Sequence, residues 1–176
     1  NNARRMHDIY NAYASNMQTE KAIEIWGKKY RSALRKNATK RYEIKLKNGK
    51  PFRMTMNQMY YIYNLYKDPS NYKALDSMKH FKGDINGLMS QINNYFNTPE
   101  GQKVKEWADW QVDELYPALY DIYNPVYMRI YRTRMPWNRY YAGRIYREGA
   151  TQDVAPDLLG DRGSSFITYI GGESTK

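Results

Sequence analysis

The sequence contains no cysteine, which excludes disulfides, thiolate zinc sites and cysteine nucleophiles. It has two histidines, His7 and His80, which lie far apart and have no neighbours in the pattern of a catalytic triad. No apolar run approaches the roughly 18 residues that a membrane-spanning helix needs. The sequence therefore gives little support to nucleophilic or zinc-dependent catalysis and none to a membrane span.

Acidic residues and phenylalanine are scarce, whereas basic residues and tyrosine are abundant. The chain has 28 Lys and Arg against 18 Asp and Glu, a formal net charge of +10, and 19 tyrosines against four phenylalanines. Tyrosine buries its ring but keeps a polar tip, so it suits contacts that are half exposed to water. Positive charge with aromatic side chains is typical of nucleic-acid binding, and also of a protein packed among acidic partners.

The length of 176 residues predicts one domain, or one domain with a tail. A domain of this size buries enough surface to fold without covalent cross-links. Because the first residue is Asn and not Met, we expect a segment of a longer protein.

The remaining chain is organised around residues 98–148, which begin with a long helix. Thr98 can cap the helix, Pro99 suits its first turn, and Glu100 lies at the positive end of the helix dipole. The pattern extends over about 35 residues, or about 50 Å, and Pro117 and Pro125 are expected to bend or break it. Apolar residues recur along it every three or four positions at Val104, Trp107, Ala108, Leu115, Leu119, Ile122, Val126 and Ile130.

A second row on this helix is aromatic and lies beside the apolar one. It consists of Tyr116, Tyr120, Tyr123, Tyr127 and Tyr131. Together the rows form a wide stripe that a single helix cannot bury, so we predict that it packs against partners.

Periodic apolar residues predict four further helices. Thr55 and Gln58 fit a capping box at the start of one of them. The helices are expected at residues 1–36 with a break near 15–19, at 56–67, around 72–78, and at 85–96.

One hairpin is predicted near residues 42–54. Residues 42–47 alternate as a strand does, Asn48 and Gly49 are typical of a two-residue turn, and residues 51–54 form the returning strand. An isolated hairpin is marginally stable, so this one should rest on the helices.

Beyond the long helix, residues 139–147 are expected to form a short extended or hairpin segment. From residue 149 the chain becomes rich in glycine and aspartate, and we interpret 149–176 as an extended arm or linker. The predicted fold is mainly α: an irregular helical bundle over residues 1–148 with one small β-hairpin and an extended C-terminal arm.

Two basic clusters are candidate binding surfaces. Residues 28–53 contain eleven Lys or Arg and one acid, and residues 129–147 contain six Arg and no acid. Each cluster has a structural interpretation as well: a solvated face for the first, and arginines packed over tyrosine rings for the second. The candidates for contact with nucleic acid or a protein partner are Lys28, Lys29, Arg31, Arg35, Lys36, Lys40, Arg41, Arg129, Arg132, Arg134, Arg139, Arg144 and Arg147.

Carboxylates also cluster on the long helix. Glu106, Asp109 and Asp113 lie on one face, with Glu114 and Asp121 nearby, and such a group could bind a divalent cation or share a proton. No second cluster with metal-ligand spacing supports this. A solvated stripe, or an ion-pair partner for the basic run of residues 28–53, explains it better. We assign no catalytic residue, metal or cofactor.

The order of these motifs resembles a helical module of the large polyvalent or internal virion proteins of tailed bacteriophages. That module has a helix-opening L-T-x-x-Q segment, matched by Thr55 and Gln58, and a long helix ending N-x-V-Y…Y-G-x-x-x-P. The second motif is matched by Asn124, Val126, Tyr127, Tyr131 and Pro136.

The match to the third motif of the module, N-Y-F-P-I-x-R, is looser. Ala142 and Gly143 replace the usual Phe-Pro, and the glycine expected before Pro136 is absent. The resemblance covers about residues 53–148. The residues that follow this motif loosely are Asn138, Tyr140, Tyr141, Ile145 and Arg147.

This resemblance implies a structural or ejection role and not a reaction. Its partners would be other virion proteins or copies of itself, with DNA as a further candidate. Its location would be the interior of the phage capsid or tail, or the cytoplasm during assembly. The alternative is a nucleic-acid-binding accessory domain of a phage polymerase or another DNA-transaction protein. An enzyme built on Glu106, Asp109 and Asp113 would need a divalent cation.

Overall fold

The computed structural model describes residues 2–47, 49–78, 81, 83–137 and 139 of the chain. The prediction of a mainly helical fold with one small hairpin is confirmed, whereas the predicted segments at 139–147 and 149–176 lie outside the described residues, Arg139 excepted. The elements are α1 (Asn2–Trp26), η1 (Gly27–Lys29), α2 (Tyr30–Thr39), β1 (Arg41–Ile44), β2 (Phe52–Thr55), α3 (Met56–Tyr66), η2 (Pro69–Asn71), α4 (Tyr72–Asp76), α5 (Ile85–Phe96), α6 (Pro99–Trp110), η3 (Gln111–Leu115) and α7 (Tyr116–Tyr131).

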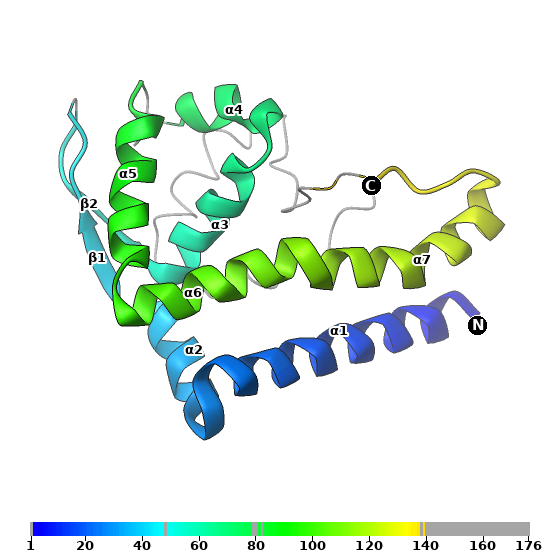
Figure 1. Ribbon diagram of the computed structural model, residues 1–176. Helices are drawn as coiled ribbons and strands as arrows, with labels where there is room; N and C mark the ends of the chain where they lie inside the picture. Colours follow the sequence, from blue (N-terminus) through cyan, green and yellow to red (C-terminus); the bar gives the residue numbers. More distant parts are fainter. Residues whose placement is uncertain (1, 48, 79–80, 82, 138, 140–176) are drawn as a thin grey trace.

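Two long helical rods define the shape. α1 runs antiparallel to the continuous rod of α6, η3 and α7 (Figure 1). α2, α3, α4, α5 and the hairpin gather at one end of these rods, so the first half of α1 and the second half of α7 extend beyond the body (Figure 1). We term these two projecting halves the arm.

The short helix α3 lies at the centre of the body. Nine of its eleven residues are buried, because α2, β2, α5 and α6 all contact it. Its start is the predicted capping box: the Gln58 amide N–H donates to Thr55 Oγ1 at 3.2 Å, and the Thr55 N–H donates to Gln58 Oε1 at 2.9 Å. A helix that is apolar on nearly every side is stable only in such a buried position.

The first helix differs from the prediction. α1 is unbroken through residues 15–19, and the chain turns at Gly27 instead, where the backbone adopts φ +71°. Glycine has no Cβ to clash in this conformation. The polar residues Ser15, Asn16 and Thr19 are exposed, so they interrupt no packing.

The hairpin exists, but its strands are shorter than predicted, and Asn48 of the predicted turn lies outside the described residues. β1 and β2 pair antiparallel with Ile44 opposite Phe52 and Arg41 opposite Thr55, so the strands are joined by residues 45–51. The strand pairing ends early because the backbone that follows Ile44 bonds to helix α5 instead of to β2.

Three side chains of α5 and its N-cap make these bonds to alternate backbone groups of the chain. Alternate residues of an extended chain present their backbone groups to the same side, so one helix can satisfy a series of them. The bonds are Tyr95 hydroxyl to Glu43 O at 2.7 Å, Lys45 N to Gln91 Oε1 at 2.8 Å, and Lys47 N to Asp84 Oδ2 at 3.1 Å.

The long helix begins as predicted, with Thr98 Oγ1 accepting from the Gly101 N–H at 3.1 Å. Neither proline ends it, so of the two predicted effects, a bend or a break, the break does not occur. Pro117 cannot donate, and its ring would clash with the carbonyl four residues earlier in an α-helix. The five residues before α7 form a π-helical turn in which Tyr116 N–H bonds to Gln111 O, and this turn accommodates the proline. Pro125 lies inside α7.

Candidate functional site

The chain reverses at the end of α7 and folds back onto it. Arg132 has φ +57°, a left-handed conformation, and its N–H caps the helix by bonding to Met128 O at 3.0 Å. On the return, the Met135 N–H donates to Asn124 Oδ1 at 2.9 Å and Tyr120 donates to Met135 O at 2.6 Å. α7 therefore ends at Tyr131, and Met135 and Trp137 lie against it.

The predicted tyrosine row is used partly within the chain. Tyr123 packs edge-on against Tyr10 of α1 with ring centroids 5.2 Å apart, and Tyr120 packs against Trp137 at 4.7 Å. Tyr127 contacts Tyr131 at 4.5 Å, but Tyr131 itself is 61% exposed. The row thus forms the seam of the arm at one end and is open to solvent at the other.

Large apolar side chains are exposed along the arm. Ile130 is 61% exposed and Ile9 50%, although both are among the residues that proteins most often bury. Exposed apolar side chains that occur together on one part of a molecule are candidates for contact with another protein. We term the following set the arm surface: Ile9, Tyr13, Met128, Ile130, Tyr131 and Trp137.

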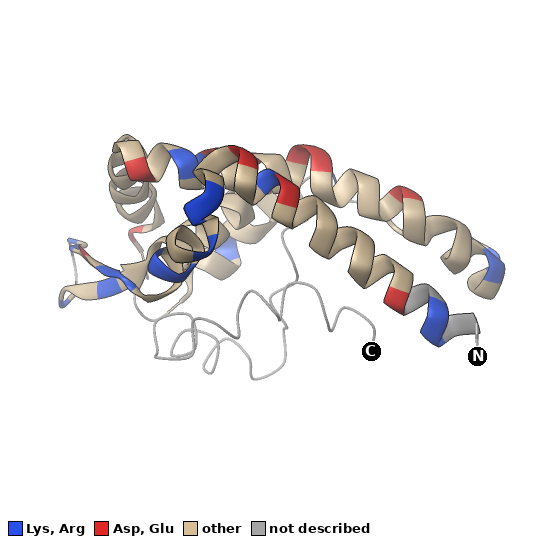
Figure 2. Cartoon of the chain, turned by 90° about the horizontal axis from the view of Figure 1, so that it is seen from below, with Lys and Arg blue, Asp and Glu red and all other residues tan. Residues whose placement is uncertain are grey.

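The first basic cluster is exposed at the opposite end, on η1, α2 and the hairpin (Figure 2). Lys36 is hydrogen-bonded to Glu100 at the start of α6, and this bond raises the pKa of Lys36 and lowers that of Glu100. The hairpin extends the cluster beyond the residues assigned from the sequence. We term the following set the basic surface: Lys28, Lys29, Arg31, Arg35, Lys36, Lys40, Arg41, Lys47, Lys50 and Arg53.

The structure does not bring the second basic cluster to this surface. Arg129, Arg132, Arg134 and Arg139 are exposed at and beyond the far end of α7, and Arg144 and Arg147 lie outside the described residues. Lys36 of the first cluster bonds to Glu100 at the start of the rod formed by α6, η3 and α7, and Arg129 of the second cluster lies near the end of that rod. The length of the rod from Glu100 to Arg129 therefore sets the separation of the two clusters. That separation is about 40 Å at the usual rise per residue.

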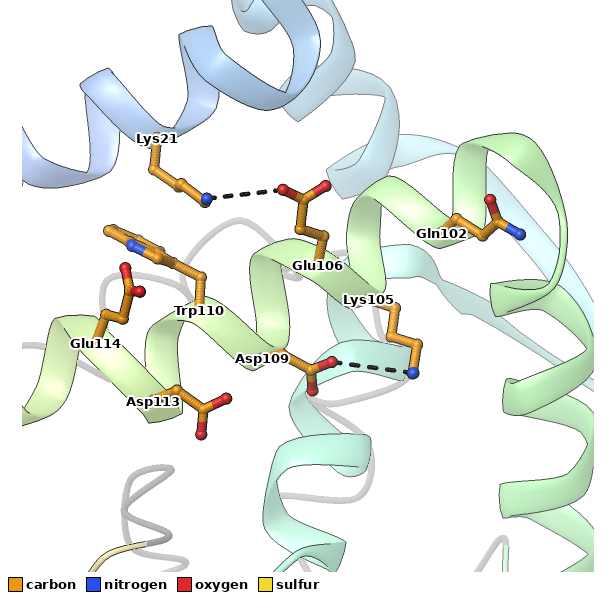
Figure 3. A pocket seen from close by; sticks show the side chains of 8 residues that line it. All are labelled: Lys21, Gln102, Lys105, Glu106, Asp109, Trp110, Asp113 and Glu114. Carbon is orange, nitrogen blue, oxygen red and sulfur yellow. Dashed lines mark ion pairs between the residues drawn. The ribbon is translucent and has the colours of Figure 1, made fainter.

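Four of the five predicted carboxylates line an open pocket of about 420 Å³ on α6, η3 and α1 (Figure 3), and Asp121 does not line it. Lys21 Nζ lies 3.6 Å from Glu106, and Lys105 Nζ lies 4.0 Å from Asp109. The residues that line the pocket are Lys21, Gln102, Lys105, Glu106, Asp109, Trp110, Asp113 and Glu114.

The ion-pair partners of these carboxylates differ from the expected ones. Asp109 also pairs with Lys67 at 2.8 Å, so the described pairs involve Lys21, Lys67 and Lys105 and not the basic run of residues 28–53. Lys21 bonds to Glu24 as well, which raises its pKa. Within the described ranges no three His, Cys, Asp or Glu side chains are grouped so that they could hold a metal ion.

Sequence reasoning missed two parts of these surfaces. Ile9 and Tyr13 fit the periodicity of a buried helix face. The sequence around them carries no signal that α1 extends beyond the body that would otherwise cover them. The hairpin basic residues carry a local signal, since they follow directly on α2, but their position beside it depends on the bonds to α5.

Within the part of the chain that the structure describes, no helix combines the length and apolar character required to cross a membrane. Comparisons with protein-family models, with curated proteins and with solved structures each return no match.

Proposed function

We propose that this chain is a structural segment of a large phage virion-associated protein, which packs against other virion proteins or copies of itself and is ejected with the genome. The observation that carries the proposal is the arm surface. The resemblance of residues 53–148 to the helical module of such proteins supplies the biological setting.

The arm has too little buried surface for its length. Among the described side chains of α1 only Ala22 is buried, and among the residues of α7 only Leu119. Helices in proteins are stabilised mainly by packing an apolar face, and propensity contributes little. Two helices that bury one residue each, and expose Ile9, Ile130 and Tyr131, therefore gain stability from packing against a further protein surface.

The self-packing form is tested by measuring the molar mass of the full chain by light scattering after size exclusion. We expect association that grows with concentration in the tens of micromolar range. Ile130→Glu should abolish it, because the charge would be buried at the contact. Ile23→Glu is the matched control, since Ile23 is 46% exposed on α1 but lies outside the arm surface. A monomer at all concentrations, or equal loss in both variants, overturns self-packing through the arm.

The virion location is tested separately, by mass spectrometry of purified particles of the phage that encodes the chain. Peptides of this segment should be recovered from intact particles and depleted from particles that have ejected their DNA. Their absence from intact particles would overturn the proposal.

The second candidate is a nucleic-acid-binding accessory domain of a phage polymerase or another DNA-transaction protein. One observation favours it: the basic surface lies on ordered elements and is distant from the arm surface. The two candidate functions therefore depend on different residues: the first on the arm surface, the second on the basic surface.

A further inference from the structure

We propose that the basic surface on η1, α2 and the β1–β2 hairpin binds the phosphate backbone of double-stranded DNA without reading its sequence. This inference deepens the second candidate function and is independent of the virion proposal, which rests on the arm surface.

The positive charge of this surface is mostly uncompensated. Glu43 is the one acid in residues 28–53, and it pairs with Lys45 at 3.3 Å, while Lys36 pairs with Glu100. A polyanion that binds a surface with such an excess of positive charge releases its own counterions, which favours binding. The basic side chains that form no ion pair with another described residue are Lys28, Lys29, Arg31, Arg35, Lys40, Lys47, Lys50 and Arg53.

These side chains lie on consecutive elements, η1, α2 and the hairpin, at one end of the molecule, and we term them the strip. Arg31 and Arg35 lie one helical turn apart on α2 and are both exposed. Lys40 occupies the junction where α2 passes into β1. On the hairpin, Met54 points into the core, so its neighbour Arg53 faces outward by the alternation of a strand. Figure 2 shows the basic residues of α2 and the hairpin at the same end of the molecule.

The elements that carry the strip are fixed to the body. The bond between Lys36 and Glu100 joins α2 to α6, and the Tyr95 and Gln91 side chains of α5 hold the hairpin backbone. The backbone that carries the cations is therefore already in place before any ligand arrives, which lowers the entropic cost of binding.

The aromatic residues beside the strip argue for a duplex over a single strand. Single-strand binding sites offer exposed rings on which bases stack. Here Tyr30 and Tyr42 are half buried, and the cations of Arg31 and Lys40 lie 5.6 Å and 5.0 Å from their ring centroids. Of the large apolar side chains found exposed in the described chain, none belongs to residues 27–55.

The hairpin argues for DNA over RNA. The major groove of B-form DNA admits a two-stranded β-ribbon, whereas the major groove of A-form RNA is too deep and narrow for side chains to enter. The β1–β2 ribbon projects from the body beside α5 (Figure 1), and its loop residues Lys47 and Lys50 are exposed.

The test is fluorescence anisotropy with a labelled 20-base-pair DNA duplex, the same sequence as an RNA duplex, and one DNA strand, at 50 and 200 mM salt. We expect sub-micromolar binding to duplex DNA at 50 mM. With about five phosphate contacts, affinity should fall by about two to three orders of magnitude at 200 mM.

Two variants locate the surface, and a third controls for net charge. R31E/R35E on α2 and K47E/K50E in the hairpin loop should each weaken duplex binding at least tenfold. R4E/R5E changes the net charge by the same amount on exposed positions of α1, at the other end of the molecule, and should change affinity less than twofold. Circular dichroism of each variant should match that of the wild type.

The outcomes separate this inference from the candidate function on which it rests. No wild-type binding to any of the three nucleic acids overturns both. Wild-type binding with equal losses in all three variants overturns the surface, because net charge alone would explain it. Tighter binding to the single strand, or equal binding to the RNA duplex, overturns the choice of duplex DNA.

Discussion

Tyr63 and Asp109, 46 positions apart in the sequence, join the central helix α3 to the long rod through a 2.8 Å hydrogen bond from the tyrosine hydroxyl to the carboxylate. Lys67 donates to the same oxygen at 2.8 Å and lies 4.7 Å from the centre of the Tyr63 ring. The three side chains thus satisfy one another at a partly buried helix contact. The carboxylate that the sequence suggested as a metal ligand serves to fasten two helices.

Replacement of Asp109 should therefore weaken the fold. Asp109→Ala leaves the Lys67 ammonium and the Tyr63 hydroxyl without their acceptor, and we expect a loss of about 1–2 kcal/mol, moderated by the partial exposure of the carboxylate. Asp113→Ala removes an exposed carboxylate one turn away and should cost less than about 0.5 kcal/mol. Urea denaturation measures both, and equal losses would contradict the role assigned to Asp109.

The fold should lose stability at alkaline pH, in part through Tyr63. Burial first, and the nearby Asp109 second, raise the pKa of Tyr63, and burial likewise raises that of Tyr60. A group with a raised folded-state pKa contributes fully below its unfolded pKa, about 10 for tyrosine, and this contribution is lost as pH rises further.

Melting temperature measured between pH 8 and pH 11.5 should accordingly fall more steeply for the wild type than for Tyr63→Phe. The variant has no hydroxyl to titrate, so it is less stable at pH 8 but less sensitive above pH 10. Parallel curves would show that Tyr63 does not contribute to the alkaline loss.

Gln91 should hold the chain beyond β1 in place. Gln91→Ala removes the acceptor of the Lys45 N–H, and we expect hydrogen exchange at that amide to accelerate at least tenfold, because the bond is replaced by water. Asn94→Ala, on the exposed part of the same helix, should leave it unchanged. Unaltered exchange in Gln91→Ala would mean that the loop is held by other contacts.

Gly101 should tolerate no side chain. A Cβ there would lie 1.9 Å from Tyr95 O and 2.7 Å from Phe96 Cα, which are backbone atoms of the preceding helix and cannot rotate away. Gly101→Ala should cost about 2–3 kcal/mol through forced separation of α5 and α6, even though alanine favours helices by about 1 kcal/mol. The control is Ser90→Ala, because Ser90 is exposed on α5. Urea denaturation measures the stability of both variants. A stabilised Gly101→Ala would contradict the close approach.

Local signals predicted the starts of α3 and α6. Thr55 and Gln58 each accept from the backbone N–H of the other, and Thr98 accepts from the Gly101 N–H, so both partners lie in one short stretch of sequence. The same holds for the strand alternation around Ile44. These elements could be predicted because the physics that forms them is local.

The errors have non-local or competing causes. The early end of the strand pairing was not predicted because Gln91 and Asp84, some forty residues away, accept from the backbone N–H groups of Lys45 and Lys47. The break near residues 15–19 was wrong because polar residues on an exposed helix face cost little, whereas Gly27 carried the better signal.

The same limit applies to the candidate surfaces. Exposure of the basic residues follows from their chemistry, but the tie between Lys36 and Glu100 joins positions 64 apart. The separation of the two basic clusters by the length of one rod also depends on the tertiary fold. Neither can be found in a window of sequence.

The π turn at Gln111–Leu115 has a consequence for the direction in which the arm surface faces. A bond to the fifth residue back encloses one residue more than an α-turn, so every side chain beyond it is rotated by about 100° from where an uninterrupted α-helix would place it. Removing a single residue there would leave both flanking helices intact in composition. It would nevertheless swing Met128, Ile130 and Tyr131 a quarter turn around the axis, so the phase of the whole projecting half is set by one inserted residue.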